Sequence, residues 1–573
     1  MAEKARPEVF VRKATGLVRE IGLLTGIICI MGHVVGLGWQ KRVFQCIGWL
    51  PVPETTYLGG WMPPLLIAFL VVWIIVMLNA YCWAVMGSAM PRAGGGYVYT
   101  SRVLGPIWGF LAGWGSWLMA VILWGVVAAA GMECLAMFGA MAGLKVVANP
   151  QTIFGFGLVV IWIISIIAIL GTRALITALH IIFWIPVIVT IIMYGIFISV
   201  TPEAMALGVQ RLFGVSAETI TRAALEHGMR EYAKYSFWDG VAAASIGAYW
   251  AYVGYTATAF VAGEVKEAYK KLPWILLLAN TFINLLYLTL PPLAARACMM
   301  VGRVENWSFL SAWSYLSHGA GKPYFSPDYI PGLNPTAPKG WLPCAAAIAA
   351  EGMGLVWLKY LFVLFGILWP INDVPPALLA STRILFAMSF DRVLPEWLAA
   401  VSKRFYSPVN AILFCAVFTT IFGAAAEAEI FGPGWLNIPW LHLWINSGTG
   451  VSQLDLWDLM CYFFTSLAAI MFPYKRRDIY EKAPFRMEIG GVPLITILGV
   501  GAFLGNCWLI WVILSSPASA LRLVKPDLGS IVSLSVTVAF IIAGLIIYAY
   551  YRYYKGRVLG VDYTTVYAQI PPE

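Results

Sequence analysis

Charged residues are scarce in this chain of 573 residues. Asp, Glu, Lys and Arg make up 11% of it, against roughly 25% in an average soluble domain. Hydrophobic residues reach 61%, and the mean hydropathy is +0.80. A chain this long and this apolar cannot hide its hydrophobic surface in one soluble core, which excludes the soluble, disordered and fibrous classes. The composition therefore predicts an all-α polytopic membrane protein that contacts the lipid bilayer.

Patterns that would bind metal or perform catalysis are also lacking. None of the five histidines occurs in His-x-x-x-His or His-Glu-x-x-His spacing, and none of the nine cysteines in Cys-x-x-Cys. A membrane-embedded enzyme would need clustered His, Asp or Glu on neighbouring spans, so we expect no enzyme, no metal site and no cofactor. Cys298 and Cys344 bracket a long loop and could pair, although two free cysteines are favoured. Asn306 begins an Asn-Trp-Ser sequon whose glycosylation stays open.

Apolar stretches long enough to cross a bilayer do occur, and there are twelve of them. They cover residues 20–48, 63–88, 106–138, 152–170, 174–199, 239–262, 273–297, 343–385, 408–424, 456–474, 491–515 and 528–551. The expected organisation is a cytoplasmic arm (1–18), a first repeat of five spans (19–199), an outer loop (200–238), a second repeat (239–474, with outer loops 298–342 and 425–454), two further spans (475–551) and a cytoplasmic tail (552–573).

The net charge of +9 is interpreted as a sign of orientation and not of nucleic-acid binding. Most of the 37 basic residues fall in the arm, the tail and the short loops that share their side of the membrane. The positive-inside rule then places both termini in the cytoplasm and predicts a multi-pass protein of the plasma membrane. The three long outer loops are rich in Trp, Tyr, Pro and Gly, so we expect ordered caps that could also receive a partner subunit.

Two spans contain glycines that weaken a helix by about 1 kcal/mol each. The first contains the stretch from Gly32 to Gly38, with His33 inside it, and the sixth contains Trp250-Ala-Tyr-Val-Gly-Tyr-Thr256. Close helix packing through Gly-x-x-x-Gly is one interpretation. The other is a pair of unwound segments at membrane depth, where free amides and carbonyls need a ligand. Interruptions at corresponding places in two halves are typical of a transporter site.

Several motifs in order resemble the amino acid–polyamine–organocation (APC) permeases, which have the leucine-transporter-like fold. These are the Gly32–Gly38 stretch, Pro91-Arg-Ala-Gly-Gly-Gly-Tyr-Val-Tyr99, Leu104-Gly-Pro106, Gly263-Glu-Val-Lys266, Ser381-Thr-Arg383, Asp391-Arg-Val-Leu-Pro395, Ser407-Pro-Val-Asn410 and Gly490-Gly-Val-Pro493. The resemblance implies secondary transport of an amino acid or related organic amine by alternating access. It also implies two inverted five-span repeats, with broken spans 1 and 6, that form a bundle (spans 1, 2, 6, 7) and a scaffold (3, 4, 8, 9).

The resemblance also assigns substrate-binding residues. The amides of Gly36, Leu37 and Gly38 would bind the substrate carboxylate, because a helix start carries free N–H groups and a positive dipole. Trp250 would be an aromatic gate, although a large apolar side chain that faces lipid or a neighbouring helix is an equal alternative. Tyr252 and Gly254 match aromatic and glycine positions of the family. Thr256 stands where many members have a carboxylate, which leaves the side-chain preference open.

A coupling ion, Na⁺ or H⁺, is expected at Asp373 in span 8. No lysine occurs in span 5, where proton-coupled members often have one. An intramembrane carboxylate indicates a functional site, and Pro375-Pro376 frees carbonyls of the preceding turn. We expect Asp373 to act with the carbonyls of Gly32 and Val35; the alternatives are an Asp that caps a broken turn or pairs with a lysine. His33 is a further candidate, or a space-filling side chain.

The resemblance also implies an outer gate, because related symporters have an arginine just beyond the first break that pairs with an acid in span 10; here these would be Arg42 and Asp455 or Asp458. The alternative is interfacial snorkelling of Lys41 and Arg42. Glu351 and Lys359 could share one face of span 8 and pair through an intermediary, and a structural ion pair or a lining of the vestibule is favoured over substrate contact. The alternative to transport as a whole is a sensing or structural subunit that keeps the transporter fold without moving solute.

Overall fold

The computed structural model describes residues 18–54, 63–232, 236–319, 324–432, 435 and 451–570. Within this part the helices and loops are accompanied by a single two-stranded hairpin, β1 (Glu488–Ile489) and β2 (Val492–Pro493). Almost all of the predicted arm and most of the predicted loop 425–454 lie outside the described residues.

Eleven helices of the described part are long and apolar enough to cross a membrane. They correspond to eleven of the twelve predicted spans. The sixth predicted span, 239–262, is instead divided into two helices of 16 and 4 residues. The helices that make up the spans are α1 (Leu23–Val34) with α2 (Leu37–Trp49), α3 (Pro64–Ala89), α5 (Pro106–Met141), α6 (Pro150–Ile169), α7 (Thr172–Ser199), α11 (Phe237–Tyr252) with α12 (Ala257–Phe260), α13 (Ala268–Met299), α16 (Leu358–Phe390), α17 (Val409–Thr419) continued to α18 (Ala425–Phe431) by a π-helical turn, α20 (Val451–Lys475), α22 (Leu494–Ser515) and α23 (Leu528–Ala549).

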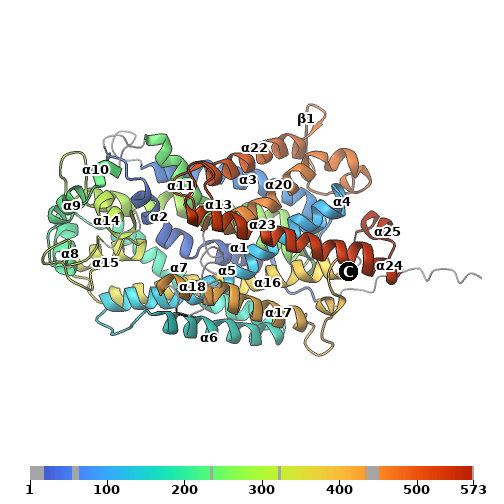
Figure 1. The fold of residues 1–573 in the computed structure, drawn as a ribbon, viewed down its shortest axis with the longest axis horizontal. Helices are drawn as coiled ribbons and strands as arrows, with labels where there is room; N and C mark the ends of the chain where they lie inside the picture. Colours follow the sequence, from blue (N-terminus) through green and yellow to red (C-terminus); the bar gives the residue numbers. More distant parts are fainter. Residues whose placement is uncertain are drawn as a thin grey trace, which may run out of the picture.

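The spanning helices run along the long axis of the molecule (Figure 1). At one end, called the cap end, lie the helices of the long connections: α8 (Pro202–Phe213), α9 (Ala217–Glu226), α10 (Met229–Tyr232), α14 (Phe309–His318) and α15 (Leu342–Gly352). At the other, the terminal end, lie α4 (Gly96–Val103), α24 (Gly556–Val558) and α25 (Tyr563–Ala568). The described parts of the connections 200–238 and 298–342 therefore contain short helices.

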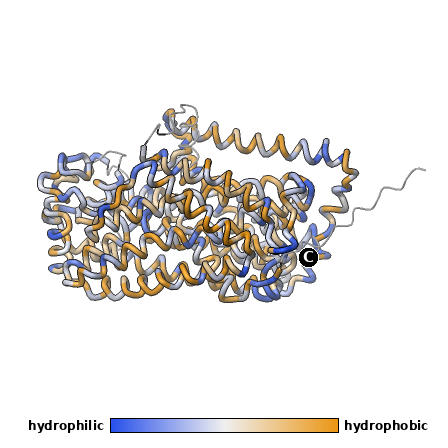
Figure 2. Tube along the Cα trace, turned by 90° about the horizontal axis from the view of Figure 1, so that it is seen from below, coloured by the Kyte–Doolittle hydropathy of each residue, from blue (hydrophilic) through white to orange (hydrophobic). Residues whose placement is uncertain are grey.

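Hydrophobic residues follow the helices through the middle of the molecule, and hydrophilic residues gather toward its two ends (Figure 2). Large aliphatic side chains lie exposed on the outside, as on α7, where more than half of the surface of Ile181, Ile188, Ile191 and Ile198 is accessible. A soluble protein rarely exposes such a continuous apolar face. Lipid is the environment in which this face is stable.

The predicted eighth span, 343–385, is wrong in its first part, because it consists of two helices. α15 ends at Gly352, and Gly354 adopts a left-handed φ of +78° before α16 begins at Leu358. α15 packs against α8 through glycines: a Cβ at Gly352 would lie 1.7 Å from the Ala204 carbonyl oxygen. The apolar run of α15 is thus buried by protein and adds nothing to the span.

Two groups of helices pack mainly among themselves. α1, α2, α3, α11 and α13 form one group, and α5, α6, α16 and α17 form the other. α5 and α16 share the most extensive contact in the molecule. The broken helices α1–α2 and α11–α12 belong to the first group, and α16 packs against α1 and α12 from the second. The two interruptions therefore lie where the groups meet.

Candidate functional site

The first predicted break is present. α1 ends at Val34 and α2 begins at Leu37, and Val35 (φ −83°, ψ 80°) and Gly36 (φ −133°, ψ −135°) between them are not helical. The first amides of α2 have no carbonyl one turn earlier to bond. The Gly36 amide already donates to the Val34 carbonyl at 3.0 Å. Of the predicted carboxylate cradle, the amides of Leu37 and Gly38 thus lie at a free helix start.

Gly38 also allows close packing. A Cβ at this position would lie 2.7 Å from the Cα atom of Ala251 in α11. A methyl group therefore cannot be added without moving α2 away from α11. The two interpretations of the glycines, an unwound segment and close helix contact, both hold, at different positions of the same stretch.

The second break lies between α11, which ends at Tyr252, and α12, which begins at Ala257. Gly254 has a left-handed φ of +93°, and a Cβ on it would lie 2.1 Å from the His33 ring. Only glycine meets both conditions, the backbone angle and the space. The two breaks are therefore in direct contact, through a side chain of α1 that lies against the backbone after α11.

Side chains of α13 bind the carbonyls that both breaks leave free. The Tyr287 hydroxyl lies 3.0 Å from the Val34 carbonyl oxygen and 2.7 Å from that of Ala251, and the Asn280 amide donates to the Tyr255 carbonyl at 3.0 Å. Tyr252 is held in turn, because its hydroxyl donates to Asn284 at 3.2 Å. These partners were not predicted. Their signal is the spacing of residues 280, 284 and 287, which lines polar groups along one face of an apolar span.

Asp373 lies at the first break and is paired with His33. His33 Nδ1 and Asp373 Oδ1 are hydrogen-bonded, and both side chains are buried. A Cβ on Gly36 would lie 3.6 Å from the second carboxylate oxygen, so Asp373 touches the break itself. Its neighbour Asn372 lies beside Gly32, and neither amide atom of Asn372 has a hydrogen-bond partner among the described residues. The predicted alternative of a lysine partner for Asp373 is wrong, because the partner is a histidine from the break.

Polar side chains on one face of α20 lead toward the second break. Ser452, Asp455, Asp458 and Tyr462 are three or four residues apart, so they share a face of the helix. Asp458 accepts a hydrogen bond of 2.9 Å from Tyr249 of α11. Tyr462 bonds the Thr256 hydroxyl at 2.7 Å. Thr256 is therefore engaged with α20 in this conformation.

A cavity of about 460 Å³ lies at the cap end and extends to the start of α2. Its lining includes Leu37 at the start of α2, Trp250 near the end of α11, and Val451 and Ser452 of α20. Trp250 is buried and lines the cavity, so it does not face lipid; its ring also lies against a neighbouring helix, beside Gly38 of α2. His318 on α14 also lines the cavity, and burial lowers its pKa to about 3, so it stays neutral in the physiological range.

The predicted gate residues lie in this region but do not touch. Among the described residues, Arg42 forms no ion pair with Asp455 or Asp458; it bonds Gln45 and packs on the Trp49 ring, 5.8 Å from its centre. Lys41, next to it, forms an ion pair of 2.8 Å with Glu133 of α5. Both side chains thus have partners within the protein. Both belong to the wall of the cavity.

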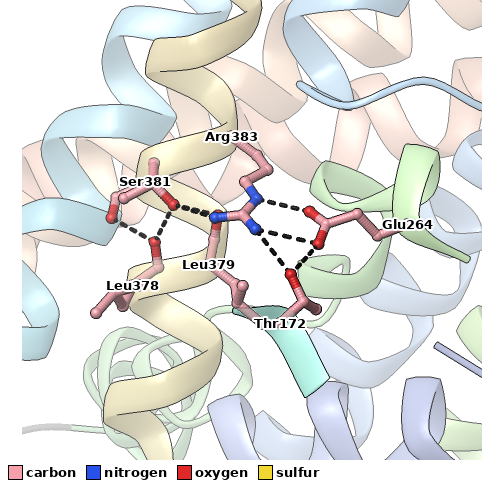
Figure 3. A network of polar contacts seen from close by, with 7 residues as sticks. Thr172, Glu264, Leu378, Leu379, Ser381 and Arg383 are labelled. Carbon is pink, nitrogen blue, oxygen red and sulfur yellow. Dashed lines mark hydrogen bonds and ion pairs between the residues drawn. The ribbon is translucent and has the colours of Figure 1, made fainter. Parts of the chain in front are cut away.

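Two buried ionic networks built from the sequence motifs lie at the terminal end. In the first, Arg383 of α16 donates to both carboxylate oxygens of Glu264, at 2.6 and 3.1 Å, and to the Thr172 hydroxyl at 3.2 Å (Figure 3). Glu264 follows α12, and its carbonyl accepts the Ile21 amide at 2.9 Å. This network thus joins the segments before α1 and after α12 to the scaffold helix α16.

The second network surrounds Asp391 at the end of α16. Arg102 of α4 donates to its two oxygens at 2.5 and 3.0 Å, and the Tyr97 hydroxyl donates at 2.9 Å. The Tyr567 hydroxyl of α25 lies 3.2 Å from that of Tyr97. The sequence motifs predict none of these contacts, because the residues that pair are hundreds of positions apart in the chain.

The structure bears on three smaller expectations. Glu351 and Lys359 form a direct ion pair of 2.9 Å, which confirms the structural ion pair; they lie on two helices, α15 and α16, so the shared helix face and the intermediary are wrong. Cys298 and Cys344 are both free and buried. Asn306 is exposed, and its modification stays a prediction.

Comparison with known proteins agrees with these breaks and motifs. The family described as "Amino acid permease" matches residues 21–542. Relatives include "Cationic amino acid transporter 4, vacuolar" of Arabidopsis thaliana, 25% identical over 62% of this chain and 51% of the relative, and "Serine/threonine exchanger SteT" of Bacillus subtilis (strain 168), 30% identical over 27% of this chain and 30% of the relative.

A third relative is "Uncharacterized transporter Rv1999c" of Mycobacterium tuberculosis (strain ATCC 25618 / H37Rv), 24% identical over 73% of this chain and 76% of the relative. The chain spans about half the length of the Arabidopsis relatives that it matches. The family consists of transporters and not of enzymes. This multi-pass membrane protein belongs to the amino acid permease family of the APC superfamily.

Proposed function

We propose that this protein is a secondary active transporter that moves an amino acid or a related organic amine by alternating access. One observation carries the proposal: a cavity at the cap end extends to the start of α2, next to two touching helix breaks, while buried ion pairs join helices at the terminal end. A transporter accessible from one side at a time has this arrangement. The organisation that goes with it is two inverted repeats, 19–199 and 239–474, followed by two further spans.

The substrate would lie between the breaks, with its carboxylate at the start of α2. The amides of Leu37 and Gly38 and the positive end of the helix dipole favour an anion there. Trp250 would cover the substrate from the cavity side, and Tyr252, Gly254 and Thr256 would shape the second break. The names of the relatives differ in substrate, from cationic amino acids to serine and threonine, so they leave the side chain open.

Counterflow in liposomes tests the transport proposal directly. Liposomes that contain the purified protein are loaded with unlabelled amino acids. The uptake of each labelled amino acid from the outside solution is then measured. We expect accumulation of at least one of them, and Trp250→Ala should lower its apparent affinity. Trp238→Ala is the matched control, because Trp238 lies on the same helix with 69% of its surface exposed. Absence of any uptake or binding would refute the proposal and favour the sensing or structural subunit.

We further propose that transport is coupled to a proton at His33 and Asp373, with the carbonyls of Gly32 and Val35 beside them. The imidazole occupies a carboxylate oxygen that Na⁺ would otherwise bind, and a histidine–carboxylate pair can hold one proton more or less. The ionisable groups that face the pair are Tyr287 of α13, near Asp373, and Asp458 of α20, near His33.

Measuring uptake while the sodium gradient and the pH gradient are varied independently distinguishes coupling to Na⁺ from coupling to H⁺. Uptake by the unaltered protein should follow an imposed pH gradient and not a sodium gradient, and Asp373→Asn should abolish that response. Glu218→Gln serves as control, because this carboxylate is in an exposed pair with Arg222 far from the breaks. Unchanged dependence on both ions in Asp373→Asn would remove Asp373 from coupling.

The outer gate stays a proposal that the open conformation does not test. Arg42 lies in the electrostatic field of Asp455, and closure would bring its guanidinium to Asp455 or Asp458. Arg42→Asp should impair uptake, and the double exchange with Asp455→Arg should restore part of it. In this proposal the cap end faces outward at the plasma membrane, and both termini are cytoplasmic.

A further inference from the structure

The two aspartates of α20 lie on the way from the cavity to the breaks. Val451 and Ser452 line the cavity, Asp455 lies one turn deeper, and Asp458 and Tyr462 follow on the same face. Each turn of helix advances 5.4 Å along the axis. Both carboxylates are buried, with residue exposures of 0% and 1%. A substrate that passes from the cavity to Thr256 therefore passes this face of α20.

These carboxylates have too few partners in the described part of the chain. Among the described residues, neither carboxylate oxygen of Asp455 has a hydrogen-bond partner. One oxygen of Asp458 accepts a hydrogen bond from the Tyr249 hydroxyl, and the other has no partner there. A buried carboxylate without partners is costly and is kept where something else completes it. The guanidinium of Arg42 interacts electrostatically with Asp455, but its hydrogen bond goes to Gln45. The neighbouring Lys41 forms an ion pair with Glu133.

A second observation comes from the opposite side, the second break. The side chain of Tyr255 is fully buried there. Its ring stacks on Tyr462 with ring centres 4.5 Å apart, and both tyrosines lie within electrostatic range of Asp458. A stacked aromatic pair thus lies beside Asp458, one of the two incompletely bonded carboxylates.

We propose that Asp455 and Asp458 bind the cationic end, an ammonium or guanidinium group, of the substrate's side chain. Such a group donates several hydrogen bonds to carboxylates, and the faces of Trp250 and the tyrosines attract it further. The substrate class is then an amino acid with a positively charged side chain. The inference rests on the proposed transport function and adds the group that selects the substrate.

The same geometry gives Arg42 a defined relation to the substrate. A guanidinium on α2 and a cation on the substrate would compete for the same carboxylate, Asp455. In the open conformation Arg42 is held away by Gln45 and Trp49, which leaves the carboxylate for the substrate. The gate and the selectivity site would therefore share Asp455, while Asp458 would serve the substrate.

Lysine and norleucine make the decisive pair of probes, because norleucine keeps the aliphatic chain and lacks the side-chain ammonium. Binding of each to the purified full chain is measured by calorimetry at one pH. We expect lysine to bind at least tenfold more tightly than norleucine. Asp455→Asn and Asp458→Asn should each reduce that ratio at least fivefold and leave norleucine affinity within twofold.

Further variants keep the inference falsifiable if one protein folds poorly. Asp455→Glu retains the charge and should keep the preference for lysine, and Glu218→Gln on the surface should behave as the unaltered protein. An equal loss of affinity for both probes in Asp455→Asn and Asp458→Asn, or an unaltered protein that prefers norleucine, would overturn the inference and leave transport intact. Failure to bind any amino acid would instead overturn the transport proposal, and this inference with it.

Discussion

Replacement of Gly254 by alanine tests the argument that the two breaks are locked together. The backbone there has φ +93°, and an added Cβ would lie 2.1 Å from the His33 ring. A left-handed conformation costs an alanine about 1–2 kcal/mol, and forcing a methyl group into a packed site costs about 1–3 kcal/mol more. The sum, about 2–5 kcal/mol, is a large share of the roughly 5–15 kcal/mol that stabilises a typical protein.

Three controls separate the two contributions. Gly143→Ala has a similar φ of +78° with no atom within 4 Å, so it should show the backbone cost alone. Gly195→Ala lies in α7, also with open space, and should be neutral or slightly stabilising. In a background of His33→Ala, Gly254→Ala should lose most of its packing cost, which a double-mutant cycle measures.

The assay is thermal melting of the purified protein, together with uptake in liposomes. We expect the melting temperature to fall in the order Gly195→Ala, Gly143→Ala, Gly254→Ala, and transport to fail only in the last. If Gly254→Ala has the same melting temperature as Gly195→Ala and transports normally, the two breaks are not locked together by this contact. If His33→Ala gives no relief, the clash with the ring is not the cause.

Two other predictions concern the terminal end and the cavity wall. Glu264→Gln should destabilise the protein by about 3–5 kcal/mol, because it leaves the buried Arg383 guanidinium uncompensated, whereas Glu218→Gln, in an exposed pair, should cost at most about 1 kcal/mol; equal melting temperatures would contradict this. His318 has a pKa lowered to about 3 by burial, so its contribution to stability is complete above pH 6.5 and is lost as the pH falls toward 3. At pH 5 the loss is about 2 kcal/mol, and His318→Gln, which can still donate to the Gly340 carbonyl, should remove this pH dependence; parallel stability curves of the two proteins would refute it.

Most of the fold could be predicted from hydrophobic length and glycine spacing. Eleven spans follow directly from runs of about 20 apolar residues, and the breaks follow from glycines at 36 and 254. The eighth span was too long because α15 is as apolar as a membrane helix but is covered by α8. Hydropathy measures whether a segment avoids water, and it does not say whether lipid or protein covers it.

The site could be predicted only in part. Backbone positions such as Leu37, Gly38 and Gly254 are determined locally, since a helix start or a positive φ depends on a few neighbouring residues. The pairing of His33 with Asp373 could not be predicted, because the two residues are 340 positions apart and each had several candidate partners. The same holds for Arg383 with Glu264 and for Arg102 with Asp391.

The sequence by itself determined that this chain is a membrane protein, which spans are interrupted, and to which family it belongs. Each of these depends on composition or on short motifs that are continuous in the chain. Only the tertiary structure decided which buried charges neutralise one another and which, like Asp455, have no hydrogen-bond partner among the residues that the structure describes. The physical reason is that electrostatic energy depends on the distance between charges in space, which the sequence does not give. The scarcity of charge indicated that the buried carboxylates matter, and their neighbours in the structure show what each one can bind.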